Sequence, residues 1–151
     1  MSVRRDVTRL VGGFDNVLDA GTPTQSGGDH EMFTRILAAG YRIVYEPAAL
    51  NWHRHRRTAA ELEKVVNGYG VGAYSALLRA LLAGGEWGAL GVAYAWFHNA
   101  QLPRLVHSWR RAPDDSTRRL IRAELKGCLV APYHYWKSVC HLKATGGERY
   151  A

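Results

Sequence analysis

The chain has 151 residues, a formal net charge of +7 and a pI near 9.7, and 47% of its residues are hydrophobic. This length suits one domain or part of one, and the hydrophobic content excludes a chain that is disordered throughout. The positive charge argues against an acidic binding surface and favours phosphate-bearing partners, such as a nucleotide, a lipid head group or nucleic acid.

The N-terminal third alternates helical and loop patterns. Residues 2–10 predict a short helix that ends at Gly12. Residues 14–28 are rich in Gly, Pro, Ser and Thr and predict a long loop, which in a compact domain is usually functional. From Gly28 the apolar residues repeat with a helical period up to Gly40, which predicts a second helix.

A β-type run follows this second helix. Residues 41–45, Tyr-Arg-Ile-Val-Tyr, end before Pro47 and predict a β-strand. A helix followed by one strand is half of an α/β unit. A lone strand needs partner strands, and no later segment of the chain offers them.

From Thr58 onward the chain is expected to be helical. Thr58 and Glu61 have the spacing of a capping box, and an apolar stripe follows them. Further helices are expected over about 87–107, broken near Pro103, and over about 114–143.

The cysteines and the apolar runs bear on location. Cys128 and Cys140 fall in one expected helix and form no C-x-x-C motif, so no disulfide is expected. The N-terminal stretch has no apolar core of a signal peptide, and the most apolar run, residues 88–97, is too short to span a membrane. We therefore expect a cytoplasmic location, which includes a peripheral place at the inner face of the membrane.

Asp29 is the first candidate for catalysis. It follows the Gly-rich loop and falls in the first turn of the second helix, where a carboxylate could take a proton from a substrate hydroxyl as a general base. Asp29 and Glu31 could equally serve only to complement the helix dipole. The local pattern leaves both interpretations open.

A His/Arg cluster closes the first part of the chain. His53 and His55 are two positions apart after the expected strand, so in an extended segment both could reach one metal ion or phosphate. Arg54 and Arg56, with Arg57, could hold a diphosphate by forked hydrogen bonds. A solvated basic surface is the alternative for all five residues.

Other functional classes find less support in the residues. The sequence has no P-loop, no G-x-S-x-G and no G-x-G-x-x-G after a strand. Four tryptophans, Trp87, Trp96, Trp109 and Trp136, are expected on helices at scattered phases, which argues against a stacking platform for nucleic acid. The alternative to an enzyme is a helical, basic module that binds an anionic membrane surface or a partner through residues 88–97 and the distal arginines. These arginines are Arg104, Arg110, Arg111, Arg118, Arg119 and Arg122.

The order VGGFD, a loop and GGDHEMFTRILAAGYRIVYEPAALNWHRHRR closely resembles family 2 glycosyltransferases with the GT-A fold. In that family a VGGFDE-like segment precedes G-[EG]-D-x-[DE]-hydrophobic-x-x-R, then A-G-Y-R-I-x-Y-x-P and a histidine. The resemblance covers roughly residues 1–57. It implies an α/β fold class, in which residues 1–57 are an incomplete GT-A-like, partly Rossmann-like segment and residues 58–151 are a mainly α-helical C-terminal region.

The resemblance also implies roles for individual residues. Asp29 matches the base that deprotonates the acceptor hydroxyl in an inverting transfer from a nucleotide sugar. Gly28 stands where many members have a glutamate, so the usual Glu-Asp pair is incomplete. Glu31 and Arg35 match positions that orient the loop and the helix.

Further matches concern the acceptor loop and the metal. Gly12, Gly13, Phe14 and Asp15 match the acceptor-side loop. His53 matches the histidine that completes a Mg²⁺ or Mn²⁺ site or contacts the donor diphosphate, and His55 is the second candidate.

The nucleotide-binding half of the family, with the D-x-D that holds the metal, has no counterpart in the sequence. We therefore expect the C-terminal, acceptor-side portion of a glycosyltransferase. It would be inactive without a nucleotide-binding N-terminal half, which could be a separate chain. The complete enzyme would use a divalent cation, a nucleotide-sugar donor and a hydroxyl acceptor, and this chain alone would bind no metal.

Overall fold

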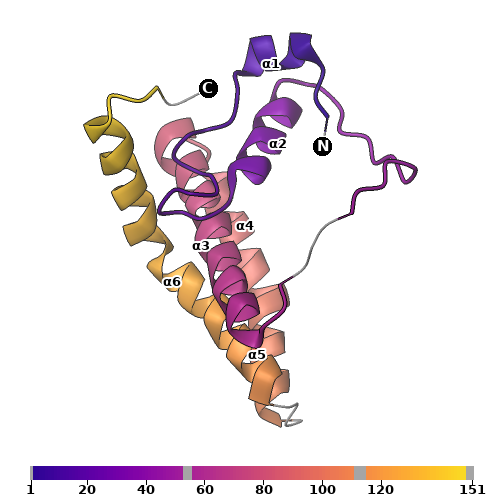
Figure 1. Ribbon diagram of the computed structural model, residues 1–151, viewed down its shortest axis with the longest axis vertical. Coiled ribbons are helices and arrows are strands. Elements are labelled where there is room, and N and C mark those ends of the chain that lie inside the picture. Colours follow the sequence, from indigo (N-terminus) through magenta and orange to yellow (C-terminus); the bar gives the residue numbers. More distant parts are fainter. Residues whose placement is uncertain (1, 53–55, 111–114, 149–151) are drawn as a thin grey trace.

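A computed structural model describes residues 2–52, 56–110 and 115–148, and almost all of its regular structure is helical (Figure 1). The helices in chain order are α1 (Arg5–Val11), α2 (Gly28–Ala38), α3 (Ala59–Gly84), α4 (Gly88–Trp96), the π-helix η1 (Phe97–Gln101), α5 (Leu102–Arg110) and α6 (Asp115–Ala144). The two longest helices, α3 and α6, form the main body of the molecule.

Helices α3 and α6 lie side by side and run in the same direction (Figure 1). Near their beginnings, Asn67 Nδ2 donates a hydrogen bond to the Ala123 carbonyl at 2.9 Å. Further along, Ser75 Oγ donates to the Ala131 carbonyl at 3.5 Å. The chain between them, α4–η1–α5, is one helical rod that returns along α3 in the opposite direction, so the three long elements form a bundle.

Two glycines allow the backbones of α3 and α6 to approach closely. A Cβ on Gly70 would lie within 3.0 Å of the Glu124 carbonyl oxygen, and a Cβ on Gly127 would lie within 3.0 Å of the Asn67 carbonyl oxygen. The two contacts are reciprocal, because each glycine faces the backbone of the other helix. Any larger residue would push the two helices apart.

The loop over residues 12–27 packs against this bundle. Val17 and Leu18 are fully buried and form a hydrophobic cluster with Tyr135 of α6. Ser138 Oγ, also on α6, donates to the Val17 carbonyl at 2.7 Å. The loop is therefore part of the core, and contacts cross the predicted boundary between residues 57 and 58.

Helices α1 and α2 form a smaller core of their own. Val7, Met32 and Ile36 are buried together, and partly buried Phe14 and Tyr41 pack against them. We refer to this group as the α1–α2 cluster. It fixes the chain on both sides of the Gly-rich loop.

The predicted α/β fold class is wrong. Residues 41–45 form no β-strand, and no strand occurs in the described parts of the chain. Val44 and Tyr45 are 81% and 87% exposed, on a segment that extends away from the helices (Figure 1). A β-type sequence forms a strand only when a neighbouring strand accepts its backbone hydrogen bonds, and the described chain offers no such strand, since its regular elements are helices. The described residues thus contain no GT-A-like, partly Rossmann-like segment, and the protein is mainly α-helical.

Of two predictions for the helical part of the chain, one is confirmed and one is wrong. The capping box is confirmed, because Glu61 N donates to Thr58 Oγ1 and Thr58 N donates to Glu61 Oε2, both at 3.2 Å. The expected break near Pro103 does not occur. Instead the helix widens into η1 just before the proline and continues as α5, which accommodates a residue that has no backbone N–H to donate.

Candidate functional site

Asp29 lies in the first turn of α2 with its side chain exposed. The residue before this helix, Gly27, has φ of 109°, in the left-handed region that favours glycine. A Cβ on Gly27 would lie within 3.0 Å of the Gly72 carbonyl oxygen, and one on Gly28 within 3.0 Å of the Leu18 carbonyl oxygen. Both glycines are therefore needed for the start of α2 to lie against α3 and the loop. Asp29 is carried on a backbone turn that is held from two sides.

Glu31 and Arg35 fasten the start of the loop to α2. Arg35 Nε lies 2.7 Å from Glu31 Oε1, and the Glu31 side chain is buried. The same guanidinium donates to the carbonyl oxygens of Val11 and of Gly13, the latter at 2.6 Å. Between these carbonyls the chain turns at Gly12, where φ is 83°. Through these contacts the Glu31–Arg35 pair fixes the start of the loop relative to α2.

Asp15 and Phe14, predicted to bind the acceptor, point inward. The Asp15 carboxylate is fully buried, with Oδ2 2.6 Å from Arg79 Nε, and its Oδ1 accepts the Val17 N–H at 3.0 Å. Phe14 is half-buried and packs on the α1–α2 cluster. In this arrangement the Asp15 carboxylate holds the loop onto α3 and is not open to a ligand.

The sequence reasoning missed Arg79. It interrupts the apolar stripe of α3, and an arginine on an otherwise apolar helix face is a signal that a buried carboxylate pairs with it. No spacing rule connects it with Asp15, however, because the two residues are 64 positions apart.

A second, partly buried polar cluster, also missed, lies where η1 meets α3 and α6. Gln101 Nε2 donates to Glu124 Oε1 and to Cys128 Sγ, each at 3.2 Å, and the Tyr74 hydroxyl donates to Gln101 Oε1 at 3.2 Å. Burial raises the pKa of the Tyr74 hydroxyl and of the Cys128 thiol. These groups form hydrogen bonds with one another, so the cluster connects η1, α3 and α6.

The structure describes only some of the residues predicted to bind the metal or the diphosphate. His53, Arg54 and His55 lie outside the described residues, whereas Arg56 is described and exposed. Within the described ranges, no three His, Cys, Asp or Glu side chains gather in a way that could hold a metal ion. We therefore assign no metal to the described residues, and the metal site at His53 stays a prediction.

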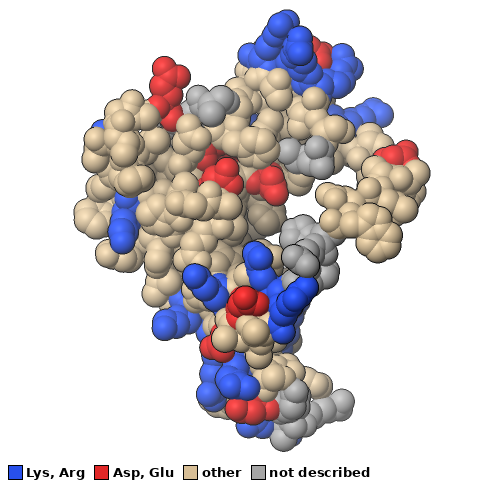
Figure 2. All heavy atoms as spheres, in the orientation of Figure 1, with Lys and Arg blue, Asp and Glu red and all other residues tan. Residues whose placement is uncertain are grey.

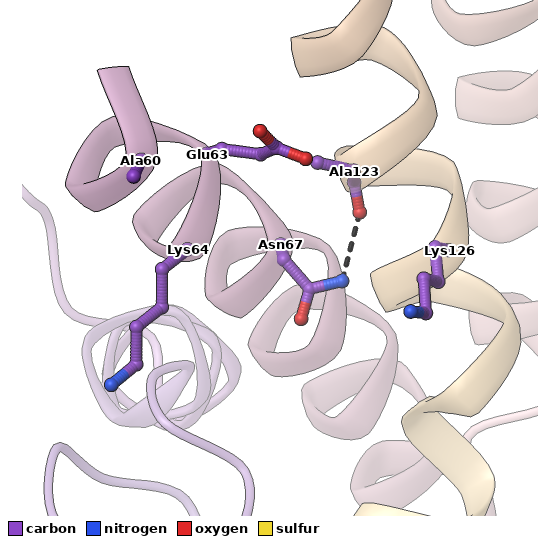
Figure 3. Close-up of a pocket in the computed structure, with 6 residues that line it drawn as sticks. All are labelled: Ala60, Glu63, Lys64, Asn67, Ala123 and Lys126. Carbon is purple, nitrogen blue, oxygen red and sulfur yellow. Dashed lines mark hydrogen bonds between the residues drawn. The ribbon is translucent and has the colours of Figure 1, made fainter.

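A shallow recess of about 320 Å³ lies between the beginnings of α3 and α6 (Figure 3). The Asn67 side chain spans it through the hydrogen bond to Ala123, and Lys64 and Lys126 stand at its rims (Figure 3). Among the described residues, none that the sequence singled out lines this recess. It is therefore separate from the turn that carries Asp29.

The structure places four of the predicted site residues on one helix. Gly28, Asp29, Glu31 and Arg35 share α2, and Arg35 binds the loop at Gly13. Comparison with protein-family models, with characterised proteins and with solved structures found no match to this chain. A function for this site therefore has to be argued from its residues and their arrangement.

Proposed function

We propose that the chain supplies the acceptor side of a sugar transfer from a nucleotide sugar to a hydroxyl group, with Asp29 as the general base. The observation that carries the proposal is the exposed Asp29 carboxylate on a turn held by Gly27, Gly28 and the Glu31–Arg35 pair. A general base has to be open to its substrate and yet fixed in position. The resemblance of roughly residues 1–57 to family 2 glycosyltransferases supports the same assignment.

In the proposed reaction the Asp29 carboxylate accepts the proton of the acceptor hydroxyl. The hydroxyl oxygen forms a bond to the anomeric carbon of the donor, and the bond from that carbon to the diphosphate breaks. The nucleoside diphosphate leaves with the electron pair, and the configuration at the carbon inverts. In this proposal Arg54 and the exposed Arg56 bind the charge on the leaving diphosphate by forked hydrogen bonds.

The proposal requires a nucleotide-binding unit, in the same polypeptide or a separate one, because the sequence has no D-x-D. A divalent cation bound there would neutralise the diphosphate of the donor. The free thiols of Cys128 and Cys140 suit a reducing compartment such as the cytoplasm, where nucleotide sugars would be the donors.

A complementation experiment tests the proposal. Extracts of cells that lack the gene are supplied with the purified chain and a panel of radiolabelled nucleotide sugars, and transfer of label to hydroxyl acceptors is measured. We expect the wild-type chain to restore transfer and Asp29→Asn to lower the rate by about 10²-fold or more. Asp19→Asn is the matched control, because Asp19 is an exposed carboxylate in the loop that precedes α2. Full activity of Asp29→Asn, or no restoration by the wild-type chain, would refute the proposal.

A further inference from the structure

Helix α4 exposes a continuous stripe of large apolar side chains. Trp87, Leu90, Tyr94 and Phe97 are 75%, 52%, 68% and 43% exposed. Their spacing of three, four and three residues places them on one side of the helix. We call these four residues the α4 stripe.

The opposite side of α4 is the one that packs on the bundle. Ala89 is buried, Trp96 stacks on Tyr74 of α3 with 5.6 Å between ring centroids, and the Ala93 carbonyl accepts the Tyr74 hydroxyl at 3.4 Å. The α4 stripe therefore faces away from α3. A helix that is apolar on all sides is normally buried, yet one side of α4 has no cover from the described residues.

Along the chain the exposed acid Glu86 precedes the α4 stripe, whereas the charged residues that follow the stripe are at first all basic. Residues 87–113 contain no Asp or Glu, and the basic residues Arg104, Arg110 and Arg111 follow the stripe along the chain. Arg110 is exposed at the end of α5, beside exposed Trp109. The stripe thus leads into a basic end without an intervening acid.

Basic side chains of α6 add to the positive charge at the end of the molecule where α5 ends. Figure 2 shows Lys and Arg gathered over the lower end of the molecule, where α5 meets the start of α6, with some Asp and Glu among them. Two of these arginines have acidic neighbours: Arg104 lies 3.7 Å from Glu124, and Arg119 lies 3.7 Å from Asp115. Arg122, one turn further along α6, is exposed.

We propose that the rod α4–η1–α5 lies on an anionic membrane surface. The α4 stripe enters the boundary between head groups and acyl chains, and Arg110 with its basic neighbours contacts the lipid phosphates. Trp and Tyr suit this boundary, because each has an apolar body and a polar group. No helix in the described part of the chain is long and apolar enough to cross a bilayer, so the rod lies in the plane of the membrane.

Nucleic acid fits this surface less well. No Lys or Arg occurs between Trp87 and Pro103, so the aromatic stripe is not interleaved with the cations that would bind a phosphate backbone. A second copy of the chain is the remaining competitor for the stripe, and the experiment below separates the two.

Vesicle flotation with the full chain tests the proposal. We expect binding to vesicles of phosphatidylcholine mixed with phosphatidylglycerol, weaker binding to phosphatidylcholine alone, and loss of binding as salt is raised. The double variant Leu90→Gln/Tyr94→Gln should partition at least about tenfold more weakly, because two apolar side chains no longer enter the lipid. Arg110→Gln should weaken binding about fivefold.

The chain offers a matched control. Leu129 and Tyr133 on α6 have the same residue types, the same spacing of four and exposures of 82% and 58%. Leu129→Gln/Tyr133→Gln should bind anionic vesicles like the wild type, and circular dichroism should show both double variants folded. Three results would overturn the proposal: no binding to anionic vesicles, equal loss in the two double variants, or a concentration-dependent dimer in sedimentation that only Leu90→Gln/Tyr94→Gln abolishes.

Discussion

Asp15 in the Gly-rich loop and Arg79 in α3 form a buried ion pair, with 2.6 Å between Oδ2 and Nε, across 64 positions of sequence. The pair fixes the loop on the bundle. Breaking a buried pair leaves one charge in the interior without its counter-charge.

Arg79→Met should therefore lower the free energy of unfolding by about 3–5 kcal/mol, which urea denaturation would measure. Arg9→Met, at an exposed position of α1, should change it by less than about 0.5 kcal/mol. In the double variant Asp15→Asn/Arg79→Met part of the loss should be recovered, because no charge is then buried. Equal stability of the single variant and the wild type would contradict the ion pair.

The contact between α3 and α6 depends on Gly70. Gly70→Ala should destabilise the protein by about 1–3 kcal/mol, because the new Cβ would meet the Glu124 carbonyl. Gly91→Ala on α4 is the control, since nothing lies within 4 Å of a Cβ there, and it should stabilise by up to about 1 kcal/mol through helix propensity. Thermal melting of both variants checks the prediction, and a shift of the same sign in both would contradict the packing.

Glu61 should make the stability depend on pH. The backbone N–H groups of Arg57 and Thr58 lower the pKa of the Glu61 carboxyl below its usual value near 4.5. A carboxyl whose pKa is lower in the folded state stabilises the fold above its unfolded pKa, and this stabilisation is lost as the pH falls through the folded pKa. The stability difference between wild type and Glu61→Gln should thus be largest at neutral pH and shrink in acid.

Urea denaturation at neutral and acid pH measures this difference. Glu63→Gln is the control, because Glu63 is exposed on the same helix and takes no part in the cap. The Glu63→Gln variant shows what the loss of one carboxylate from this helix does when the cap is left intact. A Glu61→Gln difference that did not shrink in acid would count against the capping box.

The two cysteines should react at different rates. Cys140 is exposed, whereas Cys128 is buried and its thiol has a pKa raised chiefly by that burial. Because the thiolate is the reactive form, a disulfide reagent should label Cys140 rapidly and Cys128 only after unfolding. Mass spectrometry of the labelled peptides reads this out, and Cys140→Ser should remove the fast reaction. Rapid labelling of Cys128 in the folded protein would contradict the buried Gln101–Cys128 contact.

Several local features could be predicted from the sequence. The capping box of Thr58 and Glu61 and the start of α2 at Gly28 were expected, and the structure contains both. These features depend on hydrogen bonds and side-chain spacings within a few residues, so a short stretch of sequence is enough to specify them. The position of Asp29 in the first turn of α2 follows from the same local pattern.

Features that depend on residues far apart in sequence were determined only by the tertiary structure. Residues 41–45 have a β-type sequence but no neighbouring strand in the described chain, so the strand predicted there is wrong, and so is the α/β fold class that the resemblance implied. Asp15 was expected to face a ligand, but the fold buries it against Arg79, a partner that no local pattern identifies. Helix caps are set by neighbours in sequence, whereas strands and buried ion pairs are set by neighbours in space, and only the folded chain determines those.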